Sequence, residues 1–100
     1  MTIKTLPFDA APFLDDETAQ AEYLSDALAT GDAATVAHAL GVLARAQGMT
    51  DVAKQSGLQR ENLYRALSDK GRPELATVLK AIAAMGLRLA ALPATGERAA

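Results

Sequence analysis

The pattern between Met49 and Leu67 constrains the fold more than any other part of the chain. Ala53 is followed four residues later by Gly57, with apolar residues at helical spacing on both sides. A small residue lets two helices cross closely, and glycine adopts the left-handed conformation of a tight turn at little cost. Residues 50–68 therefore predict two short helices joined by a turn, a helix-turn-helix. The second helix is expected to pack on the first through Val52, Leu63 and Leu67, with Leu58 filling the corner between them.

The rest of the chain also has the period of an α-helix, since its apolar residues recur at spacings of three and four. Alanine, the best helix former, is abundant, while valine and isoleucine are few. We therefore predict one all-α domain of five helices, each bounded by residues suited to helix ends. The expected helices run from Asp15 or Asp16 to Ala29, from Ala33 to Gln47, from Thr50 (whose hydroxyl can cap) to Ser56, from Gln59 to Ser68 and from Glu74 to Met85.

Three of these helices carry an apolar stripe that we expect to face the core. The stripes are Ala19, Tyr23, Leu24, Ala27 and Leu28 in the first helix, Val36, Leu40, Leu43 and Ala44 in the second, and Leu75, Val78, Leu79 and Ile82 in the fifth.

The helical domain is expected to comprise residues 15–92. The segments before and after its five helices do not have the helical pattern. Residues 1–14 contain two prolines and no helical period, so we expect an extended arm with Phe8 and Phe13 as apolar anchors. Residues 87–92 alternate leucine with other residues and are too few for a helix, which is typical of a short strand. The tail 93–100 is expected to fray.

The charge is unevenly divided along the chain. Residues 1–43 hold seven acidic residues against Lys4, a net charge of −6, and residues 44–72 hold six basic residues against three acidic ones, a net charge of +3. The whole chain has a net charge of −2, which taken alone argues against a nucleic-acid partner. The division suggests two surfaces with different partners, although uneven exposed charge on a small helical protein is the alternative.

Several classes of protein are excluded by what the sequence lacks. With no cysteine there are no disulfides, thiolate metal sites or cysteine nucleophiles, which fits a reducing cytoplasm. The first residues do not resemble a signal peptide, and no apolar run approaches the about 18 residues of a membrane span. His38 is the only histidine and has no carboxylate beside it, and the run Asp15-Asp16-Glu17 is explained by a helix cap. We predict a cytoplasmic protein that is not an enzyme, with no catalytic residue, metal or cofactor.

In a helix-turn-helix the second helix lies in the major groove of DNA with its N-terminal residues at the base edges. The residues expected to point outward there, and to contact bases, are Gln59, Arg60, Glu61, Tyr64 and Arg65. The residues that flank this helix and suit phosphates are Thr50, Lys54, Gln55, Lys70 and Arg72. The alternative is a solvated face with local ion pairs.

At this point the chain, from about residue 8 to residue 92, resembles the HigA-like addiction-module antidote proteins, relatives of Xre/Cro-type regulators. The segments that carry the resemblance are Phe13–Glu17, Tyr23-Leu24, Ala27-Leu28, Gly31-Asp32, Ala39–Gly41, Ala44–Met49, Gly57–Ser68, Gly71–Pro73 and Leu79–Leu89. The chain departs from these proteins at Gln59, where they more often carry serine, a better helix cap.

The resemblance implies an antitoxin that binds a small basic RelE-like toxin, a ribosome-dependent mRNA endonuclease, and that represses the shared operon at an inverted-repeat operator. The acidic half agrees with a basic partner. The residues expected to bind the toxin are Phe8, Phe13, Asp15, Asp16, Glu17 and Glu22, unless the arm folds back on its own helices.

A symmetric operator implies a homodimer, with Leu87, Leu89 and Leu92 pairing strand to strand or packing on the fifth helix. Two other functions stay open: a solitary prophage-type transcriptional regulator, and a protein-interaction module that no longer binds DNA.

Overall fold

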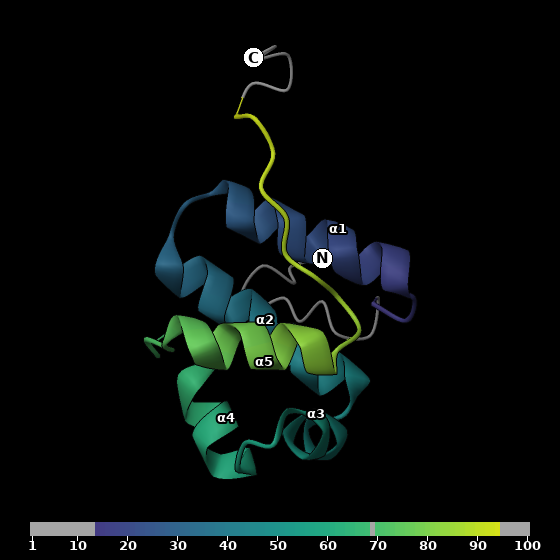
Figure 1. The fold of residues 1–100 in the computed structure, drawn as a ribbon, viewed down its shortest axis with the longest axis vertical. Helices are drawn as coiled ribbons and strands as arrows, with labels where there is room; N and C mark the ends of the chain where they lie inside the picture. The colour runs from purple at the N-terminus through teal and green to yellow at the C-terminus, as the bar shows by residue number, and fades with distance from the viewer. Residues whose placement is uncertain (1–13, 69, 95–100) are drawn as a thin grey trace, which may run out of the picture.

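The computed structural model describes residues 14–68 and 70–94 and has five helices in this part of the chain. They are α1 (Glu17–Ala29), α2 (Ala33–Gln47), α3 (Met49–Ser56), α4 (Arg60–Ala66) and α5 (Leu75–Ala84). The predicted all-α fold is confirmed. In Figure 1, α1 lies at the top, α2 and α5 cross the middle, and α3 and α4 form the bottom.

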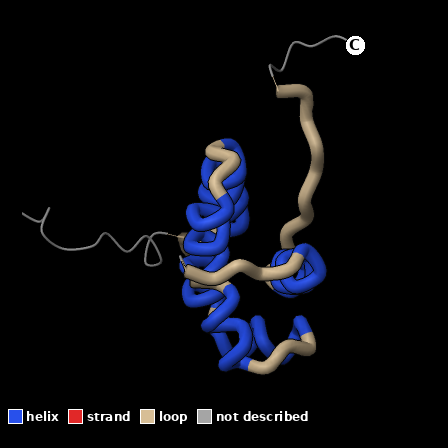
Figure 2. The backbone as a smooth tube through the Cα atoms, turned by 90° about the vertical axis from the view of Figure 1, so that its left-hand side faces the viewer, coloured by secondary structure: helices blue, strands red, loops and turns tan. Residues whose placement is uncertain are grey.

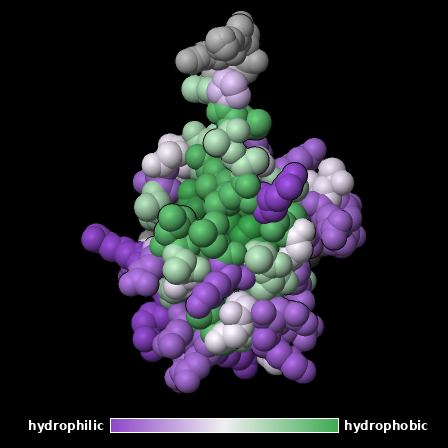
Figure 3. Space-filling model, viewed as in Figure 1, coloured by the Kyte–Doolittle hydropathy of each residue, from purple (hydrophilic) through white to green (hydrophobic). Residues whose placement is uncertain are grey.

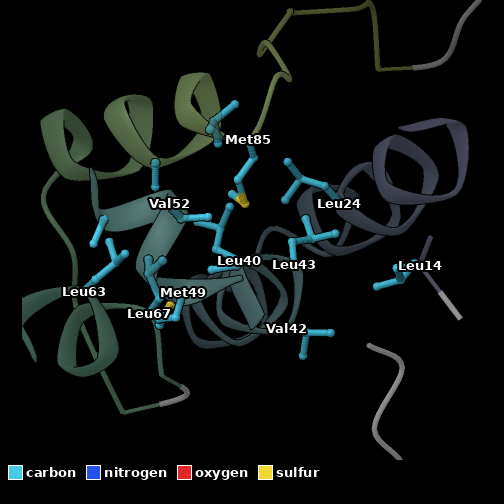
Figure 4. Close-up of a cluster of buried hydrophobic side chains, with 14 residues drawn as sticks. Leu14, Leu24, Leu40, Val42, Leu43, Met49, Val52, Leu63, Leu67 and Met85 are labelled. Carbon is cyan, nitrogen blue, oxygen red and sulfur yellow. The ribbon is translucent and has the colours of Figure 1, made fainter. Parts of the chain in front are cut away.

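Helix α2 is the centre of the fold, because both α1 and α3 pack on it and α5 contacts it as well. Its residues 39–44 are all buried, so this helix is enclosed on nearly every side. Leu40 and Leu43 meet Val52, Leu63 and the side chains of α5 in one core between the helices (Figure 4).

Local chemistry fixes where the helices begin. The N–H of Ala19 donates to Asp16 Oδ1 at 2.7 Å, and the N–H of Thr35 donates to Asp32 Oδ2 at 2.9 Å, so each aspartate caps a helix. The expected starts of α1 and α2 are therefore confirmed. The prediction for α3 is wrong by one residue, because α2 and α3 share Gly48 (φ 107°) as their boundary and Thr50 lies inside the first turn.

Two predictions for the C-terminal half are also corrected. Helix α4 ends at Ala66 rather than Ser68, since Leu67 leaves the helical conformation (φ −99°, ψ 50°). Residues 87–92 form no strand among the residues that the structure describes, and run as an extended loop along the outside of α1 (Figure 2). A strand needs a partner for its backbone groups, and within the described chain this segment has none beyond the N–H of Leu87, which donates to the carbonyl of Ile82.

The inward face of α5 differs from the prediction. Ile82 is buried and Val78 is half-buried as expected, but Leu75 is 68% and Leu79 47% exposed. The buried side of the helix is instead centred on Ala81, Ile82 and the C-cap residue Met85. Leu28 of α1 was likewise expected to face the core and is exposed. These three leucines belong to the apolar stripes of α1 and α5, but the neighbouring helices do not cover them.

A partly buried bridge of hydrogen bonds joins α1, α2 and α5, whose packing was predicted from apolar residues alone. Gln47 Nε2 donates to Gln20 Oε1 at 2.8 Å and to the carbonyl of Met85 at 2.9 Å, while Gln20 Nε2 donates to the carbonyl of Leu14 at 2.9 Å. The bridge joins the start of α1 to the ends of α2 and α5. It satisfies the polar atoms of Gln20, a side chain only 6% exposed.

Candidate functional site

The turn between α3 and α4 is built around one carbonyl group. Gly57 (φ 78°) is left-handed, and both its N–H and that of Leu58 donate to the carbonyl of Ala53, at 3.0 and 3.2 Å. The Ser56 hydroxyl adds a third bond to the same oxygen and accepts from Leu58 N–H in turn. The turn predicted at Gly57, four residues after Ala53, is therefore confirmed.

Helix α4 has one buried side and one exposed side. Leu63, 0% exposed, and Leu67 fasten it to the core, as predicted. The five proposed base-contacting residues are all exposed, at the N-cap and along α4 as far as its last turn: Gln59, Arg60, Glu61, Tyr64 and Arg65. Gln59 stands at the N-cap, where its side chain makes no capping bond to any residue that the structure describes. Gln59 is exposed.

Two of these side chains are held against each other. The guanidinium carbon of Arg60 lies 5.4 Å from the centroid of the Tyr64 ring, and Arg60 Nη2 donates to Tyr64 Oη at 3.4 Å. The residues are four apart, which puts them on one face of the helix. Both residues were expected to point outward from this helix, but the contact between them was not predicted.

The five residues proposed for phosphate contacts are all exposed, and they flank α4 on two sides: Thr50, Lys54 and Gln55 on α3, and Lys70 and Arg72 in the loop before α5. Lys70 and Arg72 share with Arg65 the lining of a shallow depression of about 750 Å³ beside α4. Basic side chains therefore lie on both sides of α4: Lys54 on α3, and Lys70 and Arg72 in the loop before α5.

The acidic residues lie on a different part of the molecule. Asp15, Asp16, Glu17 and Glu22 are exposed at or on α1, at the opposite end of the fold from α3 and α4 (Figure 1). Asp26 was not singled out from the sequence, yet it is exposed on the same helix and extends the acidic set. Phe8 and Phe13, the proposed anchors of the arm, lie outside the described residues.

The structure also shows an apolar groove that the sequence did not indicate. It is open, has a volume of about 800 Å³ and lies between the end of α1, the start of α2 and α5. Its apolar lining includes Leu28, Val36, Leu75 and Leu89. Leu28, Val36 and Leu75 were interpreted as core from their helical spacing, so no separate signal for the groove was present in the sequence.

Metal ligands and membrane spans give no further site. The described residues contain no group of three or more His, Cys, Asp or Glu side chains placed to hold a metal ion. Nor does any helix in the described part of the chain have the length and apolar character to cross a membrane.

These features define a small all-α protein with a charged two-helix corner at one end and an acidic helix at the other. Residues 4–93 match the family described as "Probable addiction module antidote protein", and the chain belongs to this family. A relative from Haemophilus influenzae, described as an uncharacterized protein, is 39% identical over 88 residues, which are 88% of this chain and 91% of the relative. No solved structure matches the chain. The expected antidote family is confirmed, and membership implies a cognate toxin as partner.

Proposed function

We propose that this protein is the cytoplasmic antitoxin of a type II toxin-antitoxin module, with toxin binding and DNA binding on opposite ends of the fold. It neutralises a small basic RelE-like mRNA endonuclease by direct contact and represses its own operon as a homodimer. Membership of the antidote family supports the first role. The second role is inferred from the α3–α4 corner and from the resemblance to HigA-like and Xre/Cro-type proteins.

The acidic helix supports a basic toxin. Between Lys4 and Arg45 the chain carries no lysine or arginine, and five exposed carboxylates lie at or on α1: Asp15, Asp16, Glu17, Glu22 and Asp26. A toxin that holds RNA is expected to be basic, so the opposite potentials speed encounter and disfavour wrong partners. Phe8 and Phe13 would then add apolar anchors to this charged contact.

The observation that carries the proposal for DNA is the division of α4 into a buried and an exposed side. Leu63 and Leu67 anchor the helix, and the exposed side presents Arg60 and Arg65 at its N-terminal part and its last turn. An arginine can grip guanine with two hydrogen bonds and a glutamine such as Gln59 can do so with adenine, each pair contributing about 1–3 kcal/mol of discrimination. Lys54, Gln55 and the other phosphate candidates would set the position of the helix in the groove.

DNA binding is tested with the purified full chain and the DNA upstream of its own gene. We expect affinity to fall steeply as salt rises from about 50 to 200 mM, because phosphate contacts release counterions. Arg60→Ala and Arg65→Ala should each weaken specific binding about tenfold. Glu22→Ala is the control, since it removes an exposed charged side chain on α1, at the opposite end of the fold from α4.

The outcomes separate the alternatives. Absence of DNA binding at low salt would mean a protein-interaction module, and specific DNA binding without any toxin encoded alongside would mean a solitary regulator. Toxin binding is tested with the small basic protein encoded next to the gene. Glu22→Lys with Asp26→Lys should abolish its capture, whereas Glu61→Lys on α4 should leave capture unchanged.

A further inference from the structure

Glu61 is the one acidic residue among the side chains proposed to contact DNA. It is exposed as the second residue of α4, next to Arg60 and one turn before Arg65. Figure 3 shows mainly hydrophilic residues over the α3–α4 end of the molecule, at the bottom of the view. A carboxylate on a surface that binds phosphates repels them and lowers the affinity for any DNA. Some other contact must offset this repulsion.

A local ion pair does not supply that contact. Glu61 and Arg65 are four residues apart, with the acid first, which is the order that favours an ion pair on a helix. Yet among the residues that the structure describes, neither side chain forms an ion pair or a hydrogen bond. The guanidinium of Arg60 lies over Tyr64 instead. Within the described chain, the oxygens of the Glu61 carboxylate are therefore available to a donor from another molecule.

The position of Glu61 in the first turn of α4 gives a second local explanation. An acidic residue there is favoured by the helix dipole. That role stabilises the fold, but it does not depend on the base sequence of any DNA that the protein binds. A role in the fold and a role in reading bases therefore predict different results in a binding experiment.

We infer that Glu61 is a specificity-determining residue, whose carboxylate accepts a hydrogen bond from the N4 amino group of a cytosine in the operator. The inference rests on the proposed binding of α4 in the major groove. An ionised carboxylate accepts hydrogen bonds and donates none. In the major groove cytosine presents a donor, adenine presents a donor beside the acceptor N7, and guanine and thymine present acceptors. Cytosine is therefore the base that suits this side chain best.

This contact serves discrimination between sequences more than affinity. Arg60, Arg65 and the basic residues beside α4 attract the phosphates of every sequence. The Glu61 carboxylate is repelled by the acceptors that the other three bases expose, and it gains a hydrogen bond at cytosine. Specificity comes from repulsion of wrong partners as well as from attraction to the right one. The carboxylate thus makes a basic surface selective.

The test compares the full native chain with Glu61→Gln by selection of binding sequences from random double-stranded DNA. The amide of glutamine both donates and accepts, which matches adenine N6 and N7. At one position where the native protein selects cytosine, we expect the variant to prefer adenine about tenfold. It should also bind unrelated DNA more tightly, because a negative charge is removed. The matched control is Glu74→Gln, the same change at an exposed carboxylate that lines the depression beside α4 and makes no capping bond within the described chain.

The outcomes separate this inference from the proposed function. A Glu61→Gln variant that selects the native sequence at every position would overturn the role of Glu61 and leave DNA binding standing. A Glu74→Gln variant with the same altered base would overturn it too, since the cause would then be charge alone. A native protein that selects no sequence would overturn sequence-specific DNA binding and this inference together. Should Glu61→Gln lose its helical circular dichroism, Glu61→Ala replaces it and must lose the preference for cytosine at that position.

Discussion

Arg60 lies over the ring of Tyr64, one turn further along α4, with 5.4 Å between the guanidinium carbon and the ring centroid. The Tyr64 hydroxyl accepts a hydrogen bond from the same guanidinium. The pair orders a long side chain that would otherwise sample many rotamers. If Arg60 contacts a base as proposed, holding it in one orientation reduces the conformational entropy that it loses when DNA binds.

Removing the ring should therefore weaken DNA binding even if Tyr64 contacts no base. We expect Tyr64→Ala to lower operator affinity about two- to fivefold, the range of an exposed cation–π pair of about 0.5–1 kcal/mol. Tyr64→Phe keeps the ring and should remain within about twofold of the native affinity. Fluorescence anisotropy with labelled operator DNA measures both. Equal losses in the two variants would show that the hydroxyl, not the stacked ring, matters.

Gly41 is a position where the structure reverses the expectation from helix propensity. In the middle of a helix, Gly→Ala ordinarily stabilises by about 0.5–1 kcal/mol. A Cβ at Gly41 would, however, overlap the carbonyl oxygen of Leu67, at the end of α4. We expect Gly41→Ala to destabilise the fold by about 1–3 kcal/mol or more, because the overlap is with backbone that cannot rotate away. Urea unfolding shows whether the free energy of unfolding falls or rises. A more stable variant would contradict the close approach of α2 to the end of α4.

The bridge made by Gln47 predicts coupling between distant parts of the chain. Gln47→Leu leaves Gln20 Oε1 and the Met85 carbonyl without their donor, and should cost about 1–3 kcal/mol of unfolding free energy. Gln20→Leu should cost a similar amount. The double variant should cost less than the sum of the two, since neither polar side chain is then left unpaired. Strict additivity in chemical denaturation would argue against the bridge.

Features set by local chemistry could be predicted from the sequence. Asp16 and Asp32 cap helices, and Gly57 turns the chain between α3 and α4, because each effect depends only on residues three or four positions away. The exposed side of α4 followed from the positions of Leu63 and Leu67. The five proposed base contacts therefore lie together, as expected.

Features set by distant contacts could not be predicted. Periodicity marks an apolar stripe but not how much of it the neighbouring helices cover, so Leu75 and Leu79 were interpreted as core. Gln20 and Gln47 are 27 residues apart, and polar residues at such a distance give no periodic signal. Residues 87–92 alternate as a strand does, yet a strand needs a partner that one described chain does not provide.

The Asp32 cap should make stability depend on pH at the acidic end of the range. The hydroxyl and N–H of Thr35 both donate to this carboxylate and hold its pKa below the ordinary value of 3.8. A pKa that is lower in the folded state adds stability above the unfolded value, and this stability is lost as the pH falls through the folded value. Asp32→Asn should therefore be less stable than the native protein at neutral pH, and the difference should shrink below pH 3.8. Thermal unfolding at both pH values checks this, and a gap that widens on acidification would contradict the lowered pKa.

The proposed assignment of the two roles to opposite ends of the fold is tested most directly by the growth of cells that express the cognate toxin. The Arg60→Ala/Arg65→Ala variant, which keeps the acidic α1 and the core residues Leu63 and Leu67, is co-expressed as the only antitoxin. If toxin and DNA bind at separate ends, this variant restores growth as fully as the native protein. If the folded variant leaves the cells poisoned, toxin contact depends on α4 and the division of roles is wrong.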